Sequence, residues 1–292
     1  MIRLPRSSIY DLTARLQAAN SVRLGTAEEQ ASTGRRINRP SDAPSDLFEV
    51  HQLNAAMAEQ DSWKSNADSA TGELNAMDTA LGQANDIIVR AREIAVDMAS
   101  DPKSLEDRAA AAKEVRGLQE SMATAANATF NDRYLFAGTA FTTVPFDTAG
   151  TYSGSTSEPS TQVAESRWVK TGLDGSSVFN GAADIFGTLE ALATALEAND
   201  ASATQATLTD LDTSTTMLSD ARAGVGAETR AASDALDNAE SLSTLFDSRL
   251  SQLINADPAT AYTKLAEVRN AYDATLKVAG SATTRTLLDY LS

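Results

Sequence analysis

The sequence predicts a mainly α-helical protein: a long antiparallel helical bundle or coiled coil formed by both chain ends, with a small α/β or β-rich inserted domain. Three observations predict this fold class. Apolar residues recur at alternating spacings of three and four from Leu53 to Met98, which places them on one helix face. The same spacing returns in two stripes between Leu236 and Ala279. Residues 139–182, in contrast, are rich in glycine, serine and threonine, as short strands and turns are.

The composition limits which residues can form the core and which kinds of functional site the chain can contain. The chain has 292 residues, of which 42% are hydrophobic and only 5% aromatic, so we expect a core of Ala, Leu, Ile and Val and close helix–helix packing. The absence of cysteine excludes disulfides and thiolate metal sites, and a single histidine, His51, excludes histidine-rich metal clusters. A net charge of −16, concentrated in the middle of the chain, argues against nucleic acid as the main partner.

The N-terminal region predicts a short amphipathic helix followed by a turn. Ile9, Leu12, Leu16 and Ala19 form its apolar stripe, and the helix is expected to break at Ser32, Thr33 and Gly34. Residues 41–46 have the composition of a turn that leads into the next helix. No run approaches the ~18–20 consecutive apolar residues of a membrane span, and the first residues lack the apolar stretch of a cleaved secretory signal.

The middle of the chain predicts a helical hairpin and then the insertion. A helix of about 50 residues is expected to run from about residue 46 to Met98. Asp101 is expected to cap a returning helix, and Pro102 to occupy its first position. After the insertion, residues 185–196 predict a helix and residues 202–222 a weaker one.

The C-terminal region contains the same Asp-Pro signal for the start of a helix. Asp257 and Pro258 predict a second cap with proline at the first helical position. We therefore expect residues 1–45 and 258–292 to form terminal helices that pair with each other or with other subunits, since short isolated helices are marginal in water. The regions expected between them are a helical core domain at 46–138 and 219–257 and a variable inserted domain at 139–218, with strands before helices.

The sequence offers little material for catalysis. It contains no phosphate-binding loop, no nucleophile elbow and no zinc-protease motif, and the spacing of its carboxylates singles out no acid–base pair. Asp210 and Asp212 lack a calcium-loop pattern. We therefore predict no enzyme activity, no cofactor and no metal. The basic cluster of Arg35, Arg36 and Arg39 fits either an acidic partner surface or an ordinary exposed loop.

Four segments carry a resemblance to flagellar proteins. Residues 34–44 (GRRINRPSDAP) resemble the flagellin-type segment that closes the N-terminal helix, although Ala43 follows Asp42 where the usual form has two adjacent acids. Residues 131–138 (NDRYLFAG) and 287–291 (LLDYL) are similar to segments of the hook-associated protein 3 family, within the flagellin-like superfamily. Residues 221–227 (ARAGVGA) resemble the point at which the C-terminal arm resumes. The match covers roughly 1–138 and 219–292, and not the insertion.

This resemblance implies a structural role at the junction of hook and filament. It implies that the terminal helices stay flexible in the monomer, suit type III export, and form an inner coiled coil on assembly. The implied partners are flagellin, hook-associated protein 1, other copies in a ring and an export chaperone, with no nucleic acid and no membrane. The implied location is the bacterial flagellum, outside the cell. The residues expected at assembly contacts are Ile9, Leu12, Leu16, Arg35, Arg36, Asp42, Leu276, Leu287, Leu288, Tyr290 and Leu291.

Three alternatives remain at this point. A flagellin or minor flagellin would form the filament itself, and an alanine-rich signalling coiled coil would share the helical stripes. The signalling coiled coil gives no reason for a strand-rich insertion or for the apolar end at residues 287–291. An enzyme that uses carboxylates of the insertion has the least support, because no motif singles them out.

Overall fold

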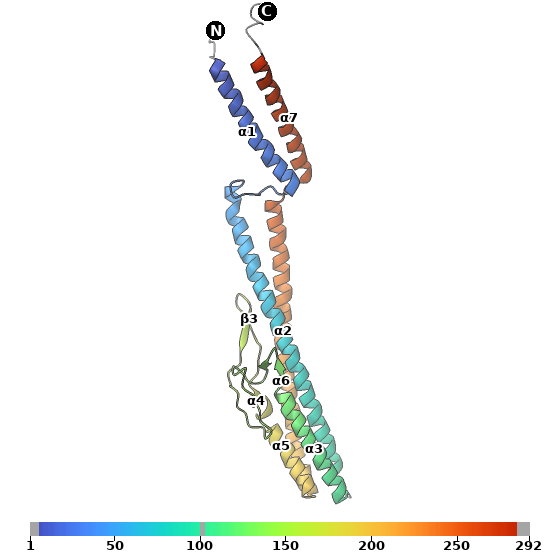
Figure 1. Cartoon of the computed structure of the whole chain (residues 1–292). Helices are drawn as coiled ribbons and strands as arrows, with labels where there is room; N and C mark the ends of the chain where they lie inside the picture. The colour runs from blue at the N-terminus through green and yellow to red at the C-terminus, as the bar shows by residue number, and fades with distance from the viewer. Residues whose placement is uncertain (1–5, 100–102, 285–292) are drawn as a thin grey trace, which may run out of the picture. The chain divides into compact units, whose positions relative to one another are not determined.

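The computed structural model describes residues 6–99 and 103–284. The chain forms two compact units, Met1–Ala58 with Ser243–Ser292 (unit 1) and Glu59–Leu242 (unit 2). In chain order the elements are α1 (Arg6–Thr33), α2 (Pro44–Met98), α3 (Leu105–Ala126), β1 (Thr129–Phe130), β2 (Arg133–Tyr134), β3 (Ser160–Ala164), β4 (Arg167–Lys170), α4 (Gly175–Phe179), α5 (Ile185–Glu197), α6 (Ala201–Ile254) and α7 (Pro258–Thr284) (Figure 1). The predicted mainly α fold with a small inserted domain is confirmed.

Two of the predicted helix boundaries follow from local chemistry. Gly34 ends α1 with a φ of +67°, a conformation that costs glycine little, and its N–H donates to the carbonyl of Gln30. Pro258 begins α7, and the Asp257 carboxylate accepts hydrogen bonds from the backbone N–H of Ala259 and Thr260, both at 3.3 Å. Since proline has no N–H to leave unpaired, it suits this first position.

The predicted start of α3 is wrong. Asp101 and Pro102 lie outside the described residues, but the helix begins at Leu105, so Pro102 is not its first residue. Ser104 is the cap: its side chain accepts from the N–H of Asp107, whose carboxylate accepts from the N–H of Ser104. This reciprocal pair satisfies two backbone donors at once and requires the Ser-x-x-acid spacing, which residues 104–107 have.

Helix α6 is a single helix of 54 residues, whereas the sequence predicts a weak helix over 202–222 and a separate stripe beginning at Leu236. Its first half is rich in serine and threonine, residues that compete with helices for backbone hydrogen bonds. In the structure their hydroxyls donate to the carbonyl four residues earlier, as Thr213 and Ser214 do to Thr209 and Asp210. Local propensity is therefore overridden by packing along the buried positions of the helix.

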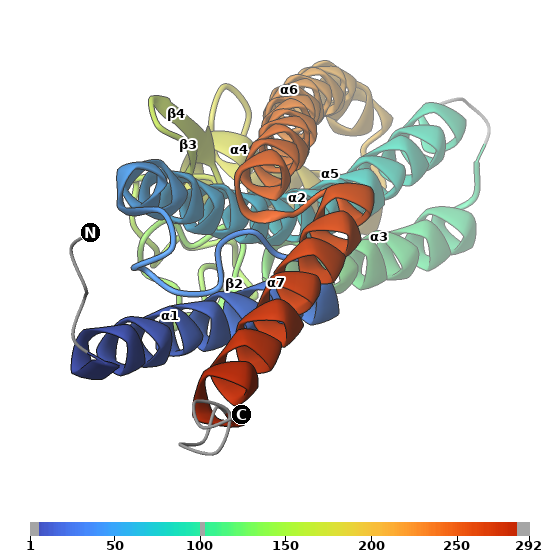
Figure 2. The ribbon, with the colours of Figure 1, turned by 90° about the horizontal axis from the view of Figure 1, so that it is seen from above.

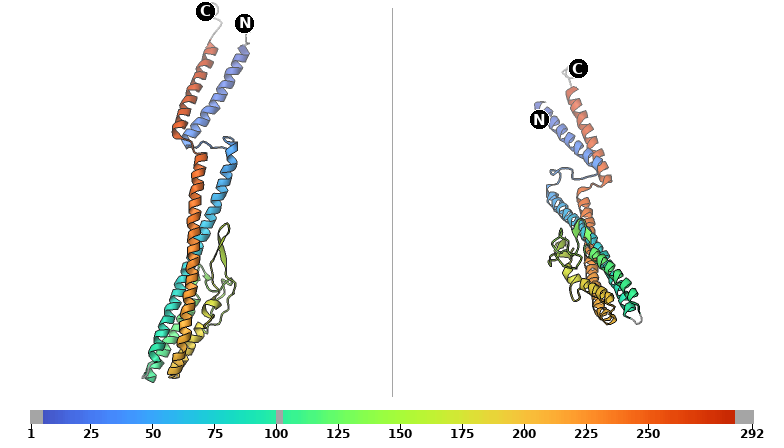
Figure 3. Two further views of the ribbon diagram at one scale, coloured as in Figure 1. Left: turned by 180° about the vertical axis from the view of Figure 1, so that it is seen from behind. Right: turned by 60° about the horizontal axis from the view of Figure 1, so that its bottom comes forward.

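The main hydrophobic core lies entirely in unit 2. There α3 packs against α5, and α2, α3, α5 and α6 run side by side (Figure 3). Small and medium apolar residues of α2, such as Ala84, Ile88 and Ala91, are fully buried, as the predicted stripe requires. Ion pairs at the rim join neighbouring helices: Arg222 to Asp78 at 2.9 Å, and Arg116 to both Glu190 and Glu197.

The insertion adds aromatic residues to this same core, and here the expectation of a core without bulky aromatic residues is wrong. Phe146 lies 5.1–5.4 Å, between ring centroids, from Tyr152, Phe179 and Phe186. Of the scarce aromatic residues, four phenylalanines are almost fully buried, including Phe136. A short irregular segment has few regular elements to pack, so large rings supply the buried area that helices supply elsewhere.

Two small antiparallel hairpins, β1–β2 and β3–β4, complete unit 2. The turn of the first contains Asn131 and Asp132, both with positive φ, as a two-residue hairpin turn requires. It brings the ring of Phe130 against Gly72 of α2, where a methyl group would lie 3.0 Å from the ring. Arg133, in the segment at 131–138 that the sequence singles out, pairs with Glu73 of α2 at 3.3 Å, so this hairpin packs against the long helix.

Unit 1 contains α1, α7 and the adjoining ends of α2 and α6. Helices α1 and α7 pack against each other, with the start of α1 and the end of α7 on the same side of the pair (Figure 1). Seen from above, α7 crosses α1 obliquely (Figure 2). The Asn20 amide donates to the Thr275 hydroxyl at 3.4 Å and marks the register of the pair. Within residues 6–99 and 103–284, no helix combines the length and hydropathy of a membrane span.

Candidate assembly surfaces in the terminal unit

The two connections of unit 1 are joined by a short ladder of backbone hydrogen bonds. The N–H groups of Arg36 and Ile37 donate to the carbonyl of Ile254, at 2.6 and 3.3 Å. In the opposite direction, the N–H of Ala256 donates to the carbonyl of Gly34 at 2.9 Å. The ladder thus ties the α1–α2 connection to the α6–α7 connection, and it uses the motif that the sequence singled out at residues 34–44.

The Arg36 side chain caps the C-terminal end of α6. Its guanidinium donates to the carbonyl of Leu253 at 2.6 Å and to the Asp46 carboxylate at 2.7 Å. The last carbonyls of a helix lack partners within the helix, and a cation there also complements the helix dipole. Arg36 therefore connects the end of α6 to the first turn of α2.

The other predicted loop residues also have local structural roles. The Asp42 carboxylate accepts from the backbone N–H of Asn38 and Arg39, at 3.0 and 2.7 Å, and so holds the turn before α2. Arg35 is exposed and pairs through its backbone with Asn255. Arg39 pairs with Glu29 at 3.1 Å. Whether a partner also contacts Arg35, Arg36 or Asp42 remains a prediction from the sequence.

Replacing Arg36 with alanine is expected to loosen the ladder. The amides of Ile37 and Ala256 should then exchange with solvent about fivefold faster, because the end of α6 loses a charge-assisted hydrogen bond. Hydrogen exchange followed by NMR measures this. Arg39→Ala is the matched control, since it removes a neighbouring guanidinium that pairs with Glu29 of α1. Equal exchange in both variants would contradict the capping role of Arg36.

The ladder should also respond to acid through Asp46. The hydrogen bond from Arg36 holds the pKa of Asp46 below its ordinary value of 3.8, and a hydrogen bond from Ser45 adds to this. A depressed pKa in the folded state means that the ionised carboxylate stabilises the fold above pH 3.8 and that this stabilisation is lost as the pH falls through the depressed value. A carbon NMR titration should show the lowered pKa, and Arg36→Ala should return it toward 3.8.

Unit 1 exposes a disproportionate share of large hydrophobic side chains. The main core cluster contains none of its residues, and the buried hydrophobic residues that the structure describes in this unit are few: Ala27, Ile37, Ala43, Val50 and Val268. Eight of the thirteen large hydrophobic residues that are exposed in the described chain belong to it: Leu12, Leu16, Val22, Phe48, Leu245, Tyr262, Leu276 and Val278. Unit 1 therefore holds most of the large apolar side chains that are exposed in the described chain.

Three of the predicted contact residues belong to this exposed set. The exposed fractions are 57% for Leu12, 47% for Leu16 and 39% for Leu276. The side chain of Ile9 is not described, and Leu287, Leu288, Tyr290 and Leu291 lie outside the described residues. The sequence therefore located part of an exposed apolar surface, and its role in assembly stays a prediction.

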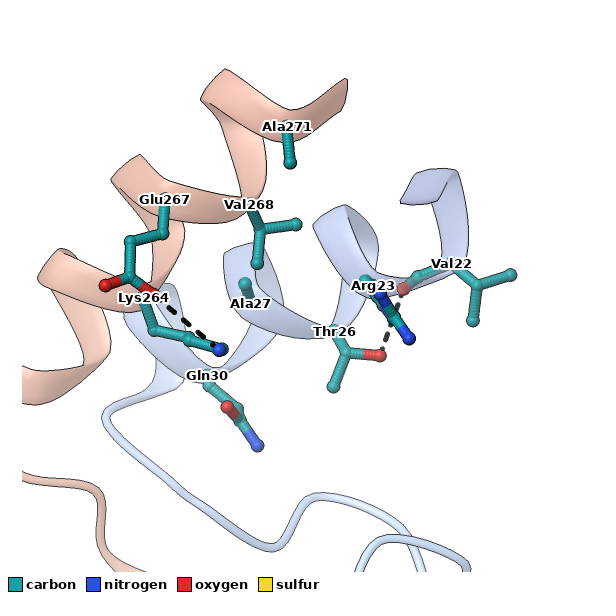
Figure 4. Close-up of a pocket in the computed structure, with 9 residues that line it drawn as sticks. All are labelled: Val22, Arg23, Thr26, Ala27, Gln30, Lys264, Glu267, Val268 and Ala271. Atoms are coloured by element: carbon teal, nitrogen blue, oxygen red, sulfur yellow. Dashed lines mark hydrogen bonds and ion pairs between the residues drawn. The ribbon is translucent and has the colours of Figure 1, made fainter. Parts of the chain in front are cut away.

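A groove runs between α1 and α7, with a volume of about 480 Å³ (Figure 4). Small side chains form its floor, among them Ala27 and Ala271, and Lys264 and Glu267 stand at its edge. We call it the terminal groove and define it by its lining residues: Val22, Arg23, Thr26, Ala27, Gln30, Lys264, Glu267, Val268 and Ala271. Sequence reasoning missed it, because a stripe of small residues becomes a groove only once the partner helix is known.

The acidic residues and the histidine that could serve as metal ligands do not form a metal site in the described part of the chain. Within the described residues, no group of three or more His, Asp or Glu side chains could hold a metal ion. Asp212 pairs with Arg92 across α6 and α2, and His51 is exposed on α2.

Known proteins similar to this chain are flagellar. Residues 9–140 match the family model of the bacterial flagellin N-terminal helical region. Flagellar hook-associated protein 3 of Salmonella typhimurium is 32% identical over 154 residues, which are 52% of this chain and 49% of that protein. A flagellin of Clostridium tyrobutyricum is 30% identical over 120 residues, 41% of this chain and 32% of the flagellin. The first of these matches thus spans about half the length of the curated relative.

The fold agrees with these sequence matches. The crystal structure of FlgL from Xanthomonas campestris superposes with a TM-score of 0.62 and 21% identity, covering 68% of this chain and 99% of that one. At this identity the likeness concerns the fold alone. The predicted resemblance to hook-associated protein 3 is confirmed by the sequence matches, and the crystal structure adds that the fold is shared.

Proposed function

We propose that this chain, which resembles flagellar hook-associated protein 3, is a structural adaptor of the bacterial flagellum that joins the hook to the flagellin filament. The observation that carries the proposal is unit 1. The backbone ladder ties its two connections together, and its described residues include none of the main core cluster and eight exposed large hydrophobic side chains. Such a unit gains stability when other subunits cover it, at roughly 25 cal/mol per Å² of apolar surface buried.

The proposal gives each region a role. The terminal helices, residues 1–45 and 258–292, form the inner coiled coil of the assembly and stay flexible before it. Residues 46–138 with 219–257 form the surrounding helical domain, and the insertion at 139–218 covers surface. One face of a ring of copies contacts hook-associated protein 1 and the other contacts flagellin. Head-to-tail contacts of this kind are heterologous and can propagate helically.

The proposal also covers how the chain leaves the cell, and it holds that the chain is not an enzyme. The chain leaves the cell through the flagellar type III export apparatus, held beforehand by an export chaperone, and functions outside the cell without a cofactor. What supports the absence of catalysis is that the relatives are named as a flagellar hook-associated protein and a flagellin.

A second candidate function is that of a flagellin or minor flagellin. The match of residues 9–140 to the flagellin N-terminal region favours it, and so does the flagellin relative. The two candidates differ in self-assembly. A flagellin extends into long filaments from seeds of its own kind, whereas a junction protein adds to hook ends in a limited layer. Electron microscopy of the purified chain added to isolated hooks distinguishes them.

Deletion of the gene is the experiment that tests the main proposal. Cells without the chain should keep hooks, lack filaments and release unpolymerised flagellin into the medium, and re-expression of the chain should restore filaments. Immunoblots of medium and cell fractions with electron microscopy measure this. Normal filaments in the deleted strain, with no second copy of the gene present, would contradict the proposal.

The apolar end of the sequence supplies a further prediction. Leu291→Asp should leave the helical content of the purified chain unchanged and block its incorporation into flagella, because Leu287, Leu288 and Leu291 are apolar residues expected at assembly contacts. Circular dichroism and immunoblots of isolated flagella measure the two properties. Ser292→Asp, a charge change at the neighbouring position, is the control. Loss of helical content in the leucine variant would show that this residue serves the monomer instead.

A further inference from the structure

The connection between α4 and α5, residues 180–184, is joined to α6 through a sulfur atom. The thioether sulfur of Met217 accepts a hydrogen bond from the backbone N–H of Ala183 at 3.2 Å. The Met217 methyl group lies beside Gly181, 3.0 Å from the place that a Cβ atom would take there. Ala183 is buried, so its N–H needs an acceptor within the protein. One side chain of α6 thus satisfies a buried donor of the connection and packs against it.

The Asn180 side chain holds the same connection less firmly. Its amide donates to the carbonyl of Gly150 at 3.3 Å and to the Asp184 carboxylate at 3.2 Å. The side-chain oxygen of Asn180 is buried without a hydrogen-bond partner. A buried polar atom without a partner costs stability. The connection therefore already contains one such atom, and the hydrogen bond to Met217 prevents a second.

The connection joins two rings of the aromatic cluster. Phe179 comes immediately before it and Phe186 soon after it, and both are fully buried. The centroids of the two rings lie 5.2 and 5.4 Å from that of Phe146. A displacement of the connection therefore acts on core residues at both of its ends.

Met217 lies where a small oxidant can reach it. Its side chain is half-buried, and Gly181 and Ala182 in the neighbouring connection are exposed. Met77 and Met122, in contrast, are fully buried in the main core. Oxidation requires contact between the sulfur and the oxidant, so Met217 is accessible to it and these two core methionines are protected.

We propose that Met217 is an oxidation site that controls how firmly the α4–α5 connection is held on α6. Hydrogen peroxide is the oxidant. A sulfur lone pair attacks one peroxide oxygen, the O–O bond breaks, and the S=O bond of methionine sulfoxide forms as water is released. The sulfur is oxidised by two electrons and the peroxide is reduced by two. The site lies in the insertion and is independent of whether the chain joins hook and filament or forms the filament.

The sulfoxide fits this position poorly. The 3.2 Å between the Ala183 nitrogen and the sulfur leaves no room for an oxygen atom between them. The oxygen therefore forms on the other lone pair, and the sulfur that still faces the N–H has lost the electron density that accepted the hydrogen bond. Rotation that would present the oxygen instead is opposed by the contact of the methyl group with Gly181. Ala183 is left without its acceptor, and the connection moves away from α6.

Amide exchange of the purified full chain, before and after treatment with excess hydrogen peroxide, tests this site. Treatment continues until free methionine added to the same solution is fully oxidised, and peptide mass spectrometry locates the sulfoxides. The expected result is oxidation of Met217 and about tenfold faster exchange of the Ala183 amide, since one buried hydrogen bond is lost. An unoxidised Met217, or an oxidised Met217 with unchanged exchange at Ala183, would overturn the proposal.

Two variants make the result specific. Met217→Leu keeps an apolar side chain without sulfur, so its Ala183 amide should exchange fast both before and after peroxide. Met98→Leu removes another half-buried methionine and should respond to peroxide as the natural chain does. If peroxide speeds the exchange of Ala183 equally in the Met217→Leu variant, another residue is responsible and the proposal fails. The purified chain gives this answer whatever the gene deletion shows about filaments.

Discussion

Replacing Phe146 with alanine is expected to lower the free energy of unfolding of unit 2 by about 3–5 kcal/mol. Phe146 is 1% exposed and its ring contacts those of Tyr152, Phe179 and Phe186. The substitution leaves a cavity at the centre of the aromatic cluster, and the surrounding rings belong to separate short segments that have little freedom to close it. Urea denaturation measures the change, with the fluorescence of Trp168 reporting on the β3–β4 hairpin.

Val144→Ala is the matched control, because Val144 is in the same loop and 50% exposed. It should change the unfolding free energy by less than about 0.5 kcal/mol. A loss below about 1 kcal/mol for Phe146→Ala would mean that the cluster repacks around the deletion and that the insertion core is loosely organised.

Arg108→Met is the second substitution with a large expected effect, a loss of about 2–4 kcal/mol. Arg108 is 4% exposed, and its guanidinium donates to the carbonyl of Met98 at 3.1 Å and to the side-chain oxygen of Asn199 at 2.6 Å. It thereby joins the end of α2, the first turns of α3 and the turn between α5 and α6. Methionine retains much of the volume and leaves both acceptors without this donor.

Thermal and urea unfolding followed by circular dichroism measure this second effect. Arg230→Met, at an exposed position of α6, is the control for removing a positive charge from this acidic chain. Equal stability of the two variants would mean that water replaces the Arg108 hydrogen bonds at little cost, and that the helix ends are held by apolar packing alone.

The parts of the fold that the sequence predicted well depend on local chemistry and on long periodic patterns. The stripe from Leu53 to Met98 occupies α2, because an apolar repeat of about 3.6 residues sustained over many turns matches the face of a helix and not the alternation of a strand. Gly34 and Pro258 mark helix boundaries because their backbone preferences act at the residue itself.

The parts that could not be predicted depend on distant partners. The serine- and threonine-rich start of α6 reads as a weak helix until α2 supplies a surface for its buried face. The aromatic cluster joins residues from Phe136 to Phe186 that show no periodicity. The sequence marks Arg36 as part of a basic cluster, but its partner is a backbone carbonyl 217 positions later, which no pattern in the sequence marks.

The sequence separation of the contacts in unit 1 has a consequence for the order of folding. Asn20 bonds to a residue 255 positions away, and Arg36 to one 217 positions away. Contacts of this kind close very long loops, whose entropic cost is met before any of the contacts is gained. During synthesis from the N-terminus, α1 has no α7 to pair with until almost the whole chain has been made. Unit 1 is therefore expected to fold late, after the local hairpins of unit 2.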